Sequence, residues 1–165
     1  STVIADVLSD LGYAVRIKWP NDIALETPMH TWAKCTGILL EKKGDLLVAG
    51  IGINIVSHPP VADLREGAAL PAGSLTELKP TPSALTLWKS IARRFATFDA
   101  ENFLAKWPAS GETRLLWLGE TVTLTTATDV IRGRFAGLGP SGELRLVTPE
   151  GEALHTAGSL RLAAS

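Results

Sequence analysis

The chain has 165 residues, 45% of them hydrophobic and 20% charged, and its 16 Lys and Arg residues nearly balance 17 Asp and Glu residues. This composition is typical of a soluble globular protein and excludes a disordered tail. The net charge of −1, with no basic run interleaved with aromatic residues, argues against a nucleic-acid partner. No apolar run reaches the roughly 20 residues that cross a bilayer and no signal-peptide pattern opens the chain, so we expect a cytoplasmic protein.

Two single residues add to this picture. Cys35 is the only cysteine, which excludes an internal disulfide and a cysteine-cluster metal site. The chain opens at Ser1 directly in helix-like sequence, and its only methionine is Met29. We therefore expect the sequence to be a piece of a longer protein.

In the first third of the chain, hydrophobic periodicity predicts one helix and then strands. The expected helix spans 3–11, and the expected strands span 14–19, 35–42 and 46–55. Pro20-Asn21-Asp22 should end the first strand in a turn, and residues 26–33 should form a loop. Lys43-Gly44-Asp45 is typical of a hairpin turn between the last two strands.

The remainder predicts a loop, two helices and then a small β domain. Residues 57–82 should form a loop with one helical turn at 74–78. Thr81-Pro82 should open a helix whose aromatic residues Trp88, Phe95 and Phe98 belong to the core. After a short helix at 100–107 and chain breakers at 108–114, period-two runs at 120–126, 130–138, 143–148 and 152–156 predict a closed or half-closed β barrel.

The sequence Lys18-Trp19-Pro20-Asn21-Asp22 places a cation, an amide and a carboxylate within five residues at the end of an expected buried strand. A turn made rigid by proline can hold such groups in fixed directions, as the binding of a charged ligand requires. A purely structural Asn-Asp turn beside a solvated lysine is the alternative.

A second candidate element pairs Lys34 with the strand sequence Gly50-Ile51-Gly52-Ile53-Asn54. Glycine at every second position leaves one face of a strand bare, so a flat ligand can approach. A three-residue turn would place Lys34 directly opposite Asn54, and we prefer this register because it brings an ammonium and an amide together. A two-residue Gly44-Asp45 turn would put the two side chains on opposite faces unless a bulge intervenes. Alternatively, Lys34 is solvated and the glycines only relieve packing.

The other reactive residue types are weaker candidates. A lone cysteine in a strand is more often a small core residue than a nucleophile, and Cys35 has no histidine nearby in the sequence. His30, His58 and His155 are far apart and lack acidic partners at ligand spacing, so we expect no protein-held metal site.

Taken together, Lys18-Trp19-Pro20-Asn21-Asp22, the stretch from Lys34 through Gly37 to Glu41, and Gly50-Ile51-Gly52-Ile53-Asn54 closely resemble the consecutive motifs of biotin protein ligases. The resemblance covers nearly the whole chain. The stretch between Asp22 and Lys34 is several residues longer than the family pattern, and the family's glycine- and arginine-rich loop would lie before Ser1.

The resemblance implies an α+β fold. It consists of part of a mixed or antiparallel sheet packed with helices, as in class II synthetase-like biotin and lipoate ligases, followed by a small SH3-like β barrel. The implied domains are residues 1–112, the C-terminal part of the catalytic domain, and residues 113–165, the barrel.

The resemblance also implies a two-step ligase. Biotin and ATP form biotinyl-5'-AMP and pyrophosphate, and a lysine of a biotin carboxyl carrier protein then attacks the mixed anhydride. Magnesium is expected with ATP, without an assigned protein ligand. The implied partner is the carrier protein. A second copy of the chain, in a homodimer, is a further candidate partner that the resemblance does not decide.

In this reading Lys34 is the catalytic cation, and Asp22 lies near the incoming lysine to position or deprotonate it. Asn21 and Asn54 contact the adenylate, Lys18 neutralises phosphate, and the glycines form the floor. The implied residues that bind biotin, ATP or the adenylate are Lys18, Trp19, Asn21, Lys34, Gly37, Gly50, Gly52 and Asn54.

Two alternatives remain open at this stage. A lipoate ligase would share the fold and the lysine, although the Trp-Pro-Asn-Asp and Gly-Ile-Asn sequences favour biotin. A truncated, inactive interaction module would instead bind a partner through its barrel and an exposed hairpin edge.

Overall fold

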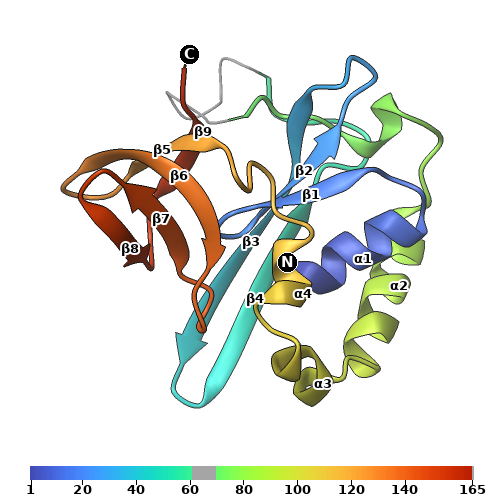
Figure 1. Ribbon diagram of the computed structural model, residues 1–165. Coiled ribbons are helices and arrows are strands. Elements are labelled where there is room, and N and C mark those ends of the chain that lie inside the picture. Colours follow the sequence, from blue (N-terminus) through green and yellow to red (C-terminus); the bar gives the residue numbers. More distant parts are fainter. Residues whose placement is uncertain (61–69, 165) are drawn as a thin grey trace. The chain divides into compact units, whose positions relative to one another are not determined.

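The computed structural model describes residues 1–60 and 70–164 (Figure 1). The chain divides into two compact units, one made of Ser1–Ile17 and Asn21–Phe98, the other of Lys18–Pro20 and Asp99–Ser165. The part of the expected loop at 61–69 lies outside the described residues, and the domain division at 112/113 stays a prediction. Within the described ranges, none of the helices has the length and apolar character needed to cross a membrane.

The elements up to residue 98 form one sheet with helices beside it. They are α1 (Thr2–Asp10), β1 (Val15–Lys18), β2 (Asp22–Glu26), β3 (Trp32–Lys43), β4 (Leu46–Ile53), the 3-10 helix η2 (Leu75–Glu77) and α2 (Ala84–Ala96). The strands are ordered β1-β2-β3-β4, and β3 is antiparallel to both of its neighbours. Figure 1 shows α1 and α2 side by side, and these two helices contact each other.

Strand β2 was not expected, because Pro20-Asn21-Asp22 was predicted to form a turn and residues 26–33 a loop. The three central residues of β2, Ile23, Ala24 and Leu25, are all buried. A strand buried on both faces has no alternation of apolar and polar residues, so its period-two signal is missing. The expected helix at 3–11 and the strand at 14–19 are confirmed to within two residues at each end.

The preferred hairpin register is wrong by one residue. Lys43 pairs with Leu46, so the turn has the two residues Gly44 and Asp45, and Gly37 lies opposite Gly52. Gly44 has a φ of 60°, a left-handed conformation that glycine adopts without a steric penalty and that suits a two-residue turn. The local turn therefore decided the register.

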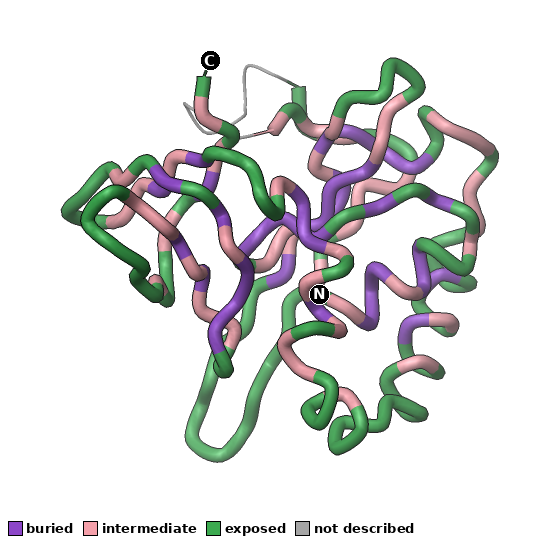
Figure 2. The backbone as a smooth tube through the Cα atoms, viewed as in Figure 1, coloured by how far each residue is buried: buried purple, intermediate pink, exposed green. Residues whose placement is uncertain are grey.

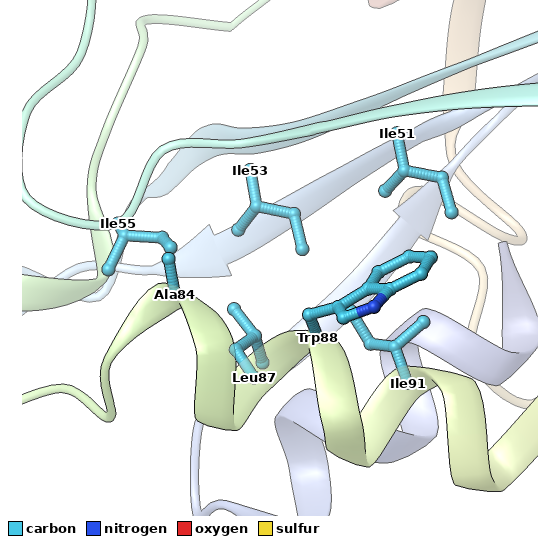
Figure 3. Close-up of a pocket in the computed structure, with 7 residues that line it drawn as sticks. All are labelled: Ile51, Ile53, Ile55, Ala84, Leu87, Trp88 and Ile91. Atoms are coloured by element: carbon cyan, nitrogen blue, oxygen red, sulfur yellow. The ribbon is translucent and has the colours of Figure 1, made fainter.

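The expectation that Trp88, Phe95 and Phe98 are core residues is also wrong. Their exposed fractions are 60%, 50% and 36%, whereas Leu87 and Ile91 on the same helix are buried. Figure 3 shows Leu87, Trp88 and Ile91 of α2 facing Ile51 and Ile53 of β4 across a cavity of about 210 Å³. The helix packs through a narrower stripe than its apolar residues span, and the rest of its apolar face stays exposed (Figure 2).

The elements from residue 99 onward are two short helices and a five-stranded sheet. They are α3 (Ala100–Ala105), α4 (Ala109–Glu112), β5 (Thr121–Thr125), β6 (Val130–Leu138), β7 (Leu144–Thr148), β8 (Gly151–His155) and β9 (Ser159–Leu162). The strand order is β8-β7-β6-β5-β9, with antiparallel pairs throughout.

The core of this sheet confirms the expected SH3-like barrel. Its fully buried side chains alternate along the strands and are Val122, Leu124, Phe135, Leu144, Leu146 and Leu160. The last strand, β9, returns to pair with the first, β5, which protects that edge of the sheet. This strand and helix α4 were not expected from the sequence.

Candidate functional site

A charged pair on the β2–β3 sheet is the centre of the candidate site. The Lys34 Nζ atom lies 2.6 Å from Asp22 Oδ1, with exposed side-chain fractions of 44% and 16%. At this distance the two opposite charges attract each other directly. The ammonium is thus held in one place and still reaches solvent with its remaining hydrogens.

Gly37 forms the surface beneath this pair. A Cβ atom built on Gly37 would lie 3.5 Å from Lys34 Nζ and 3.7 Å from Asp22 Oδ1. Both charged side chains therefore lie over the bare backbone of Gly37. Its cross-strand partner, Gly52, points to the same face of the sheet and also lacks a side chain.

A β-bulge places Lys34 on this face. The register of β2 and β3 pairs Ile23 with Thr36 and Ala24 with Lys34, so Cys35 is the extra residue. In a regular strand, residues 34 and 37 would point to opposite faces, because their separation is odd. The bulge shifts this alternation by one residue, and Lys34 joins Asp22 and Gly37 on one face.

Asn21 continues the strand pairing beyond Asp22. Its side-chain Nδ2 donates a hydrogen bond to the main-chain oxygen of Ile38 at 2.5 Å, and the Ile38 N–H donates to the Asn21 main-chain oxygen at 3.1 Å. The amide nitrogen of Asn21 thus holds β3, and its amide oxygen is the atom suited to accept a hydrogen bond from a ligand.

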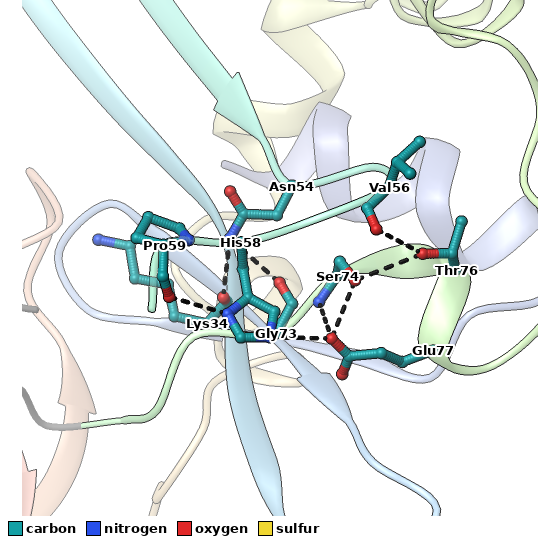
Figure 4. Close-up of polar contacts among 9 residues, drawn as sticks. All are labelled: Lys34, Asn54, Val56, His58, Pro59, Gly73, Ser74, Thr76 and Glu77. Atoms are coloured by element: carbon teal, nitrogen blue, oxygen red, sulfur yellow. Dashed lines mark hydrogen bonds and ion pairs between the residues drawn. The ribbon is translucent and has the colours of Figure 1, made fainter. Parts of the chain in front are cut away.

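Asn54 is tied to the main chain of Lys34 and not to its ammonium. Its Nδ2 donates to the Gly73 oxygen at 3.1 Å and to the Lys34 main-chain oxygen at 3.5 Å (Figure 4). The Asn54 N–H donates to the Cys35 oxygen at 2.8 Å, as the two-residue hairpin turn requires. The direct convergence of amide and ammonium that we preferred is therefore not formed in the structure.

Gly50 and Gly52 leave one face of β4 open without a steric requirement for glycine. The nearest atoms to a Cβ on either residue would lie 3.9 Å away, which is ordinary contact. The alternate residues Ile51 and Ile53 point to the other face, toward α2 (Figure 3). The glycines thus keep side chains off the face that carries Lys34.

Lys18 and Trp19 belong to the other compact unit. Trp19 is buried, and its indole N–H donates to the Gly142 oxygen at 3.0 Å, in the turn between β6 and β7. The only polar hydrogen of its side chain is therefore used within this unit. Lys18 is buried with 6% of its surface exposed. The proposed roles of these two residues in ligand binding rest on the motif resemblance.

Residues 71–77 contact β3, a contact that the sequence did not predict. We call this segment the strap. The Lys34 N–H donates to the Pro71 oxygen at 2.7 Å, and the Gly73 N–H donates to the Lys34 oxygen at 3.0 Å. These bonds form a parallel bridge between Lys34 and Ala72. This stretch was expected to be surface loop with one helical turn at 74–78, and η2 confirms the turn. The approach to β3 was not expected, and its only signal in the sequence is the small residues Ala72, Gly73 and Ser74.

Three comparisons with known proteins bear on this site. The family model described as "Biotin protein ligase C terminal domain" matches residues 117–159. A biotin–(acetyl-CoA-carboxylase) ligase of Paracoccus denitrificans is 32% identical over 147 residues, which is 82% of this chain and 58% of that protein. The crystal structure of biotin protein ligase from Aquifex aeolicus superposes with a TM-score of 0.74 at 26% identity, over 98% of this chain and 72% of that one.

The chain is similar to biotin protein ligases in sequence and in fold over most of its length. It spans somewhat more than half the length of the curated biotin ligase that it matches. The Aquifex enzyme has also been solved in complex with biotin and ATP, and that structure superposes with a TM-score of 0.71 at 26% identity over 99% of this chain and 68% of that one. The expected fold of biotin ligases is confirmed.

Metal-ligating side chains do not gather around the ligase motifs. Within residues 1–60 and 70–164, no three His, Cys, Asp or Glu side chains are grouped so that they could hold a metal ion. Asp22, the acidic residue nearest the candidate site, is paired with Lys34. The magnesium expected with ATP stays a prediction.

Cys35 is a core residue, as expected. It has no exposed surface, and its Sγ atom donates to the Ile23 oxygen at 3.5 Å. Burial raises the pKa of the Cys35 thiol to about 11, because the charged thiolate would lose its hydration. The residue beside Lys34 therefore does not act as a nucleophile.

We expect Cys35 to resist thiol reagents in the folded chain. Both burial and the raised pKa keep the thiol neutral and inaccessible at pH 8, so a disulfide-exchange dye should label less than one tenth of the chain in the time that labels urea-unfolded chain completely. Absorbance of the released dye measures this. Native labelling at the rate of free cysteine would contradict the buried assignment.

Proposed function

We propose that this chain forms part of the active site of a biotin protein ligase, which activates biotin with ATP and transfers it to a lysine of a biotin carboxyl carrier protein. The observation that carries the proposal is the Lys34 ammonium, held by Asp22 over the bare backbone of Gly37. The relationship to the ligases of Paracoccus denitrificans and Aquifex aeolicus supplies the reaction.

The first step joins two anions, which explains the need for a fixed cation. A biotin carboxylate oxygen attacks the α-phosphorus of ATP, a new P–O bond forms, and pyrophosphate leaves with the electrons of the broken bond. Negative charge accumulates between the carboxylate and the phosphate in the transition state. An ammonium already positioned there stabilises that charge without having to reorganise.

The pairing with Asp22 suits Lys34 to this task. The ammonium has three hydrogens and Asp22 engages it from one side, so further hydrogens can bind the carboxyl oxygen of biotin and the α-phosphate. The salt bridge also restricts the long lysine side chain before the ligands arrive. This lowers the entropy lost on binding.

The second step needs a neutral amine. The lysine of the carrier protein attacks the carbonyl carbon of biotinyl-5'-AMP, an amide bond forms, and AMP leaves as the acyl–phosphate bond breaks. Asp22 has a second carboxylate oxygen that can accept a hydrogen from the incoming ammonium and orient it or take its proton. Asp22 therefore serves Lys34 in the first step and the carrier lysine in the second.

The remaining residues bind and shape. Asn21, through its amide oxygen, and Asn54 contact the adenylate, and Lys18 neutralises phosphate. Gly37, Gly50 and Gly52 leave the face of the sheet that carries Lys34 free of side chains. The planar parts of the ligand can therefore approach the backbone. Magnesium accompanies the phosphates of ATP.

Removing the ammonium is the direct test of Lys34. In calorimetric titrations of this chain with a non-hydrolysable biotinyl-adenylate analogue, we expect Lys34→Ala to weaken binding about 10- to 100-fold, the usual cost of losing a hydrogen bond from a charged donor. In a full-length form of the ligase, the same substitution should abolish biotin-dependent exchange of pyrophosphate with ATP.

Lys42→Ala is the matched control for this experiment. Lys42 lies on the same strand, β3, and is exposed, so its removal changes the net charge of the chain equally without touching the candidate site. The affinity of the Lys42→Ala variant for the analogue should stay within twofold of the native value. Equal affinity of the native chain and Lys34→Ala would remove Lys34 from the proposed role.

Asp22→Asn should separate the two steps. The substitution keeps a hydrogen-bond acceptor for Lys34 but removes the carboxylate, so pyrophosphate exchange should fall less than tenfold while transfer to the carrier protein falls about 100-fold or more. Single-turnover transfer from preformed biotinyl-5'-AMP, measured in the full-length ligase, reports the second step alone. Equal losses in both steps would show that Asp22 acts only through Lys34.

The acid substrate distinguishes the biotin ligase from a lipoate ligase. We expect biotin with ATP to raise the thermal unfolding temperature of the ligase, and lipoate with ATP to leave it unchanged, because only a ligand that binds the folded state stabilises it. At a hundredfold excess over the dissociation constant the stabilisation is about 2.7 kcal/mol. Stabilisation by lipoate alone would reverse the assignment of the substrate.

A second candidate function is an interaction module, and one observation favours it. The tip of the β3–β4 hairpin exposes Leu39, Leu46 and Leu47, with exposed fractions of 60%, 69% and 68%, and Trp88 of α2 is 60% exposed. Apolar surface of this kind marks association with another protein or with a second copy of the chain. A chain that is monomeric by light scattering and still binds the adenylate analogue would argue against this function.

A further inference from the structure

The strap at 71–77 is held from a second side by a histidine that the proposed mechanism does not use. His58 lies beyond the end of β4, and its Nε2 atom lies 3.1 Å from Glu77 Oε1, at the end of the strap (Figure 4). The exposed side-chain fractions are 31% for His58 and 43% for Glu77. This contact links the segment that follows Asn54 to the strap.

Both ring nitrogens of His58 face groups that accept hydrogen bonds. The Nδ1 atom lies 2.9 Å from the Pro59 oxygen, and a carbonyl oxygen can only accept. The Nε2 atom faces the carboxylate of Glu77, which in its ionised form also only accepts. A neutral imidazole carries one N–H group, so only the doubly protonated ring satisfies both contacts.

Glu77 also binds Ser74, a second residue of the strap. The same Oε1 atom that faces His58 accepts hydrogen bonds from the Ser74 N–H at 3.2 Å and from the Ser74 hydroxyl at 2.9 Å. Ser74 follows Gly73, whose N–H donates to the Lys34 oxygen and whose oxygen accepts from Asn54. His58 is therefore connected through three residues to the main chain of Lys34.

The strap has little freedom to shift where it meets β3. A Cβ atom on Gly73 would lie 2.7 Å from the Cβ of Ala33, closer than real Cβ contacts come. The backbone at Gly73 is thus in close contact with β3. Gly73 and Pro71 are the residues through which the strap binds the main chain of Lys34.

We propose that His58, in its imidazolium form, is a positioning residue that fastens the strap to Lys34 and Asn54 and makes this attachment depend on pH. The ion pair with Glu77 exists only while the ring is doubly protonated, so the attachment is stronger in the imidazolium form and weaker in the neutral form. Among the described residues, Glu77 is the charged group that contacts His58, and Lys34 on β3 is paired with Asp22 on β2. The consequence for the ligand rests on the proposed function.

The chain without ligand tests the attachment itself. Amide hydrogen exchange of Gly73 is compared between the native chain and His58→Gln, at pH 5.5 and at pH 8.5. Glutamine keeps one neutral donor at both pH values, so it mimics the neutral ring. We expect Gly73 to exchange about two- to fivefold faster in His58→Gln at pH 5.5, the effect of a partly exposed ion pair, and equally fast at pH 8.5.

Two further variants make the result specific. At pH 5.5, Glu77→Gln should speed the exchange of the Gly73 amide as much as His58→Gln does. The double variant should not speed it further. His30→Gln is the matched control, because His30 pairs with Glu26 at 3.0 Å on an exposed turn outside the strap. It should not change exchange at Gly73. An effect of His58→Gln that is absent at pH 5.5, or equal at both pH values, overturns the proposal.

Binding of the biotinyl-adenylate analogue gives the functional readout. The affinity of the native chain relative to His58→Gln should be about two- to fivefold higher at pH 5.5 and equal at pH 8.5. A chain that binds no analogue at either pH contradicts the proposed function of this chain, and the exchange ratio at Gly73 then still decides the role of His58. Binding without any pH-dependent difference between the two forms overturns the positioning role.

Discussion

The candidate site depends on one salt bridge, between Lys34 and Asp22, and on the bulge that makes it possible. Two charges that meet at 2.6 Å over a glycine need side chains on one face of the sheet. The extra residue at Cys35 provides this by reversing the alternation of β3 between Lys34 and Thr36. Two consecutive buried residues, Cys35 and Thr36, are the trace of the bulge in the burial pattern.

Main-chain hydrogen bonds then hold the bulged strand on both sides. Asn21 and Ile38 exchange bonds on the side of β2, and Asn54 and the strap bind the backbone of Lys34 on the other side. The backbone of Lys34 is thus held on both sides, and the salt bridge with Asp22 holds its side chain. Such an arrangement positions an ammonium before a ligand arrives, as transition-state stabilisation requires.

The two faces of β4 explain why the glycines and isoleucines alternate. Gly50 and Gly52 leave the Lys34 face bare, and Ile51 and Ile53 face α2 across a cavity (Figure 3). The same strand therefore offers a ligand surface on one side and a packing surface on the other. The tip of the β3–β4 hairpin is exposed (Figure 2), and Trp88 is 60% exposed; these two features support the alternative of an interaction surface.

The sequence by itself determined the resemblance to biotin ligases, most helices and strands and the list of candidate site residues, because these depend on local spacing and on the order of motifs. Lys18 to Asp22, Lys34 and Asn54 could all be named without coordinates. Strand β2 could not be found, since burial on both faces removes its alternation. Only the tertiary structure decided the hairpin register, the bulge at Cys35 and the strap on Lys34. These features depend on which backbone groups meet across strands, and hydrogen bonds between main chains leave almost no mark on the side chains that a sequence records.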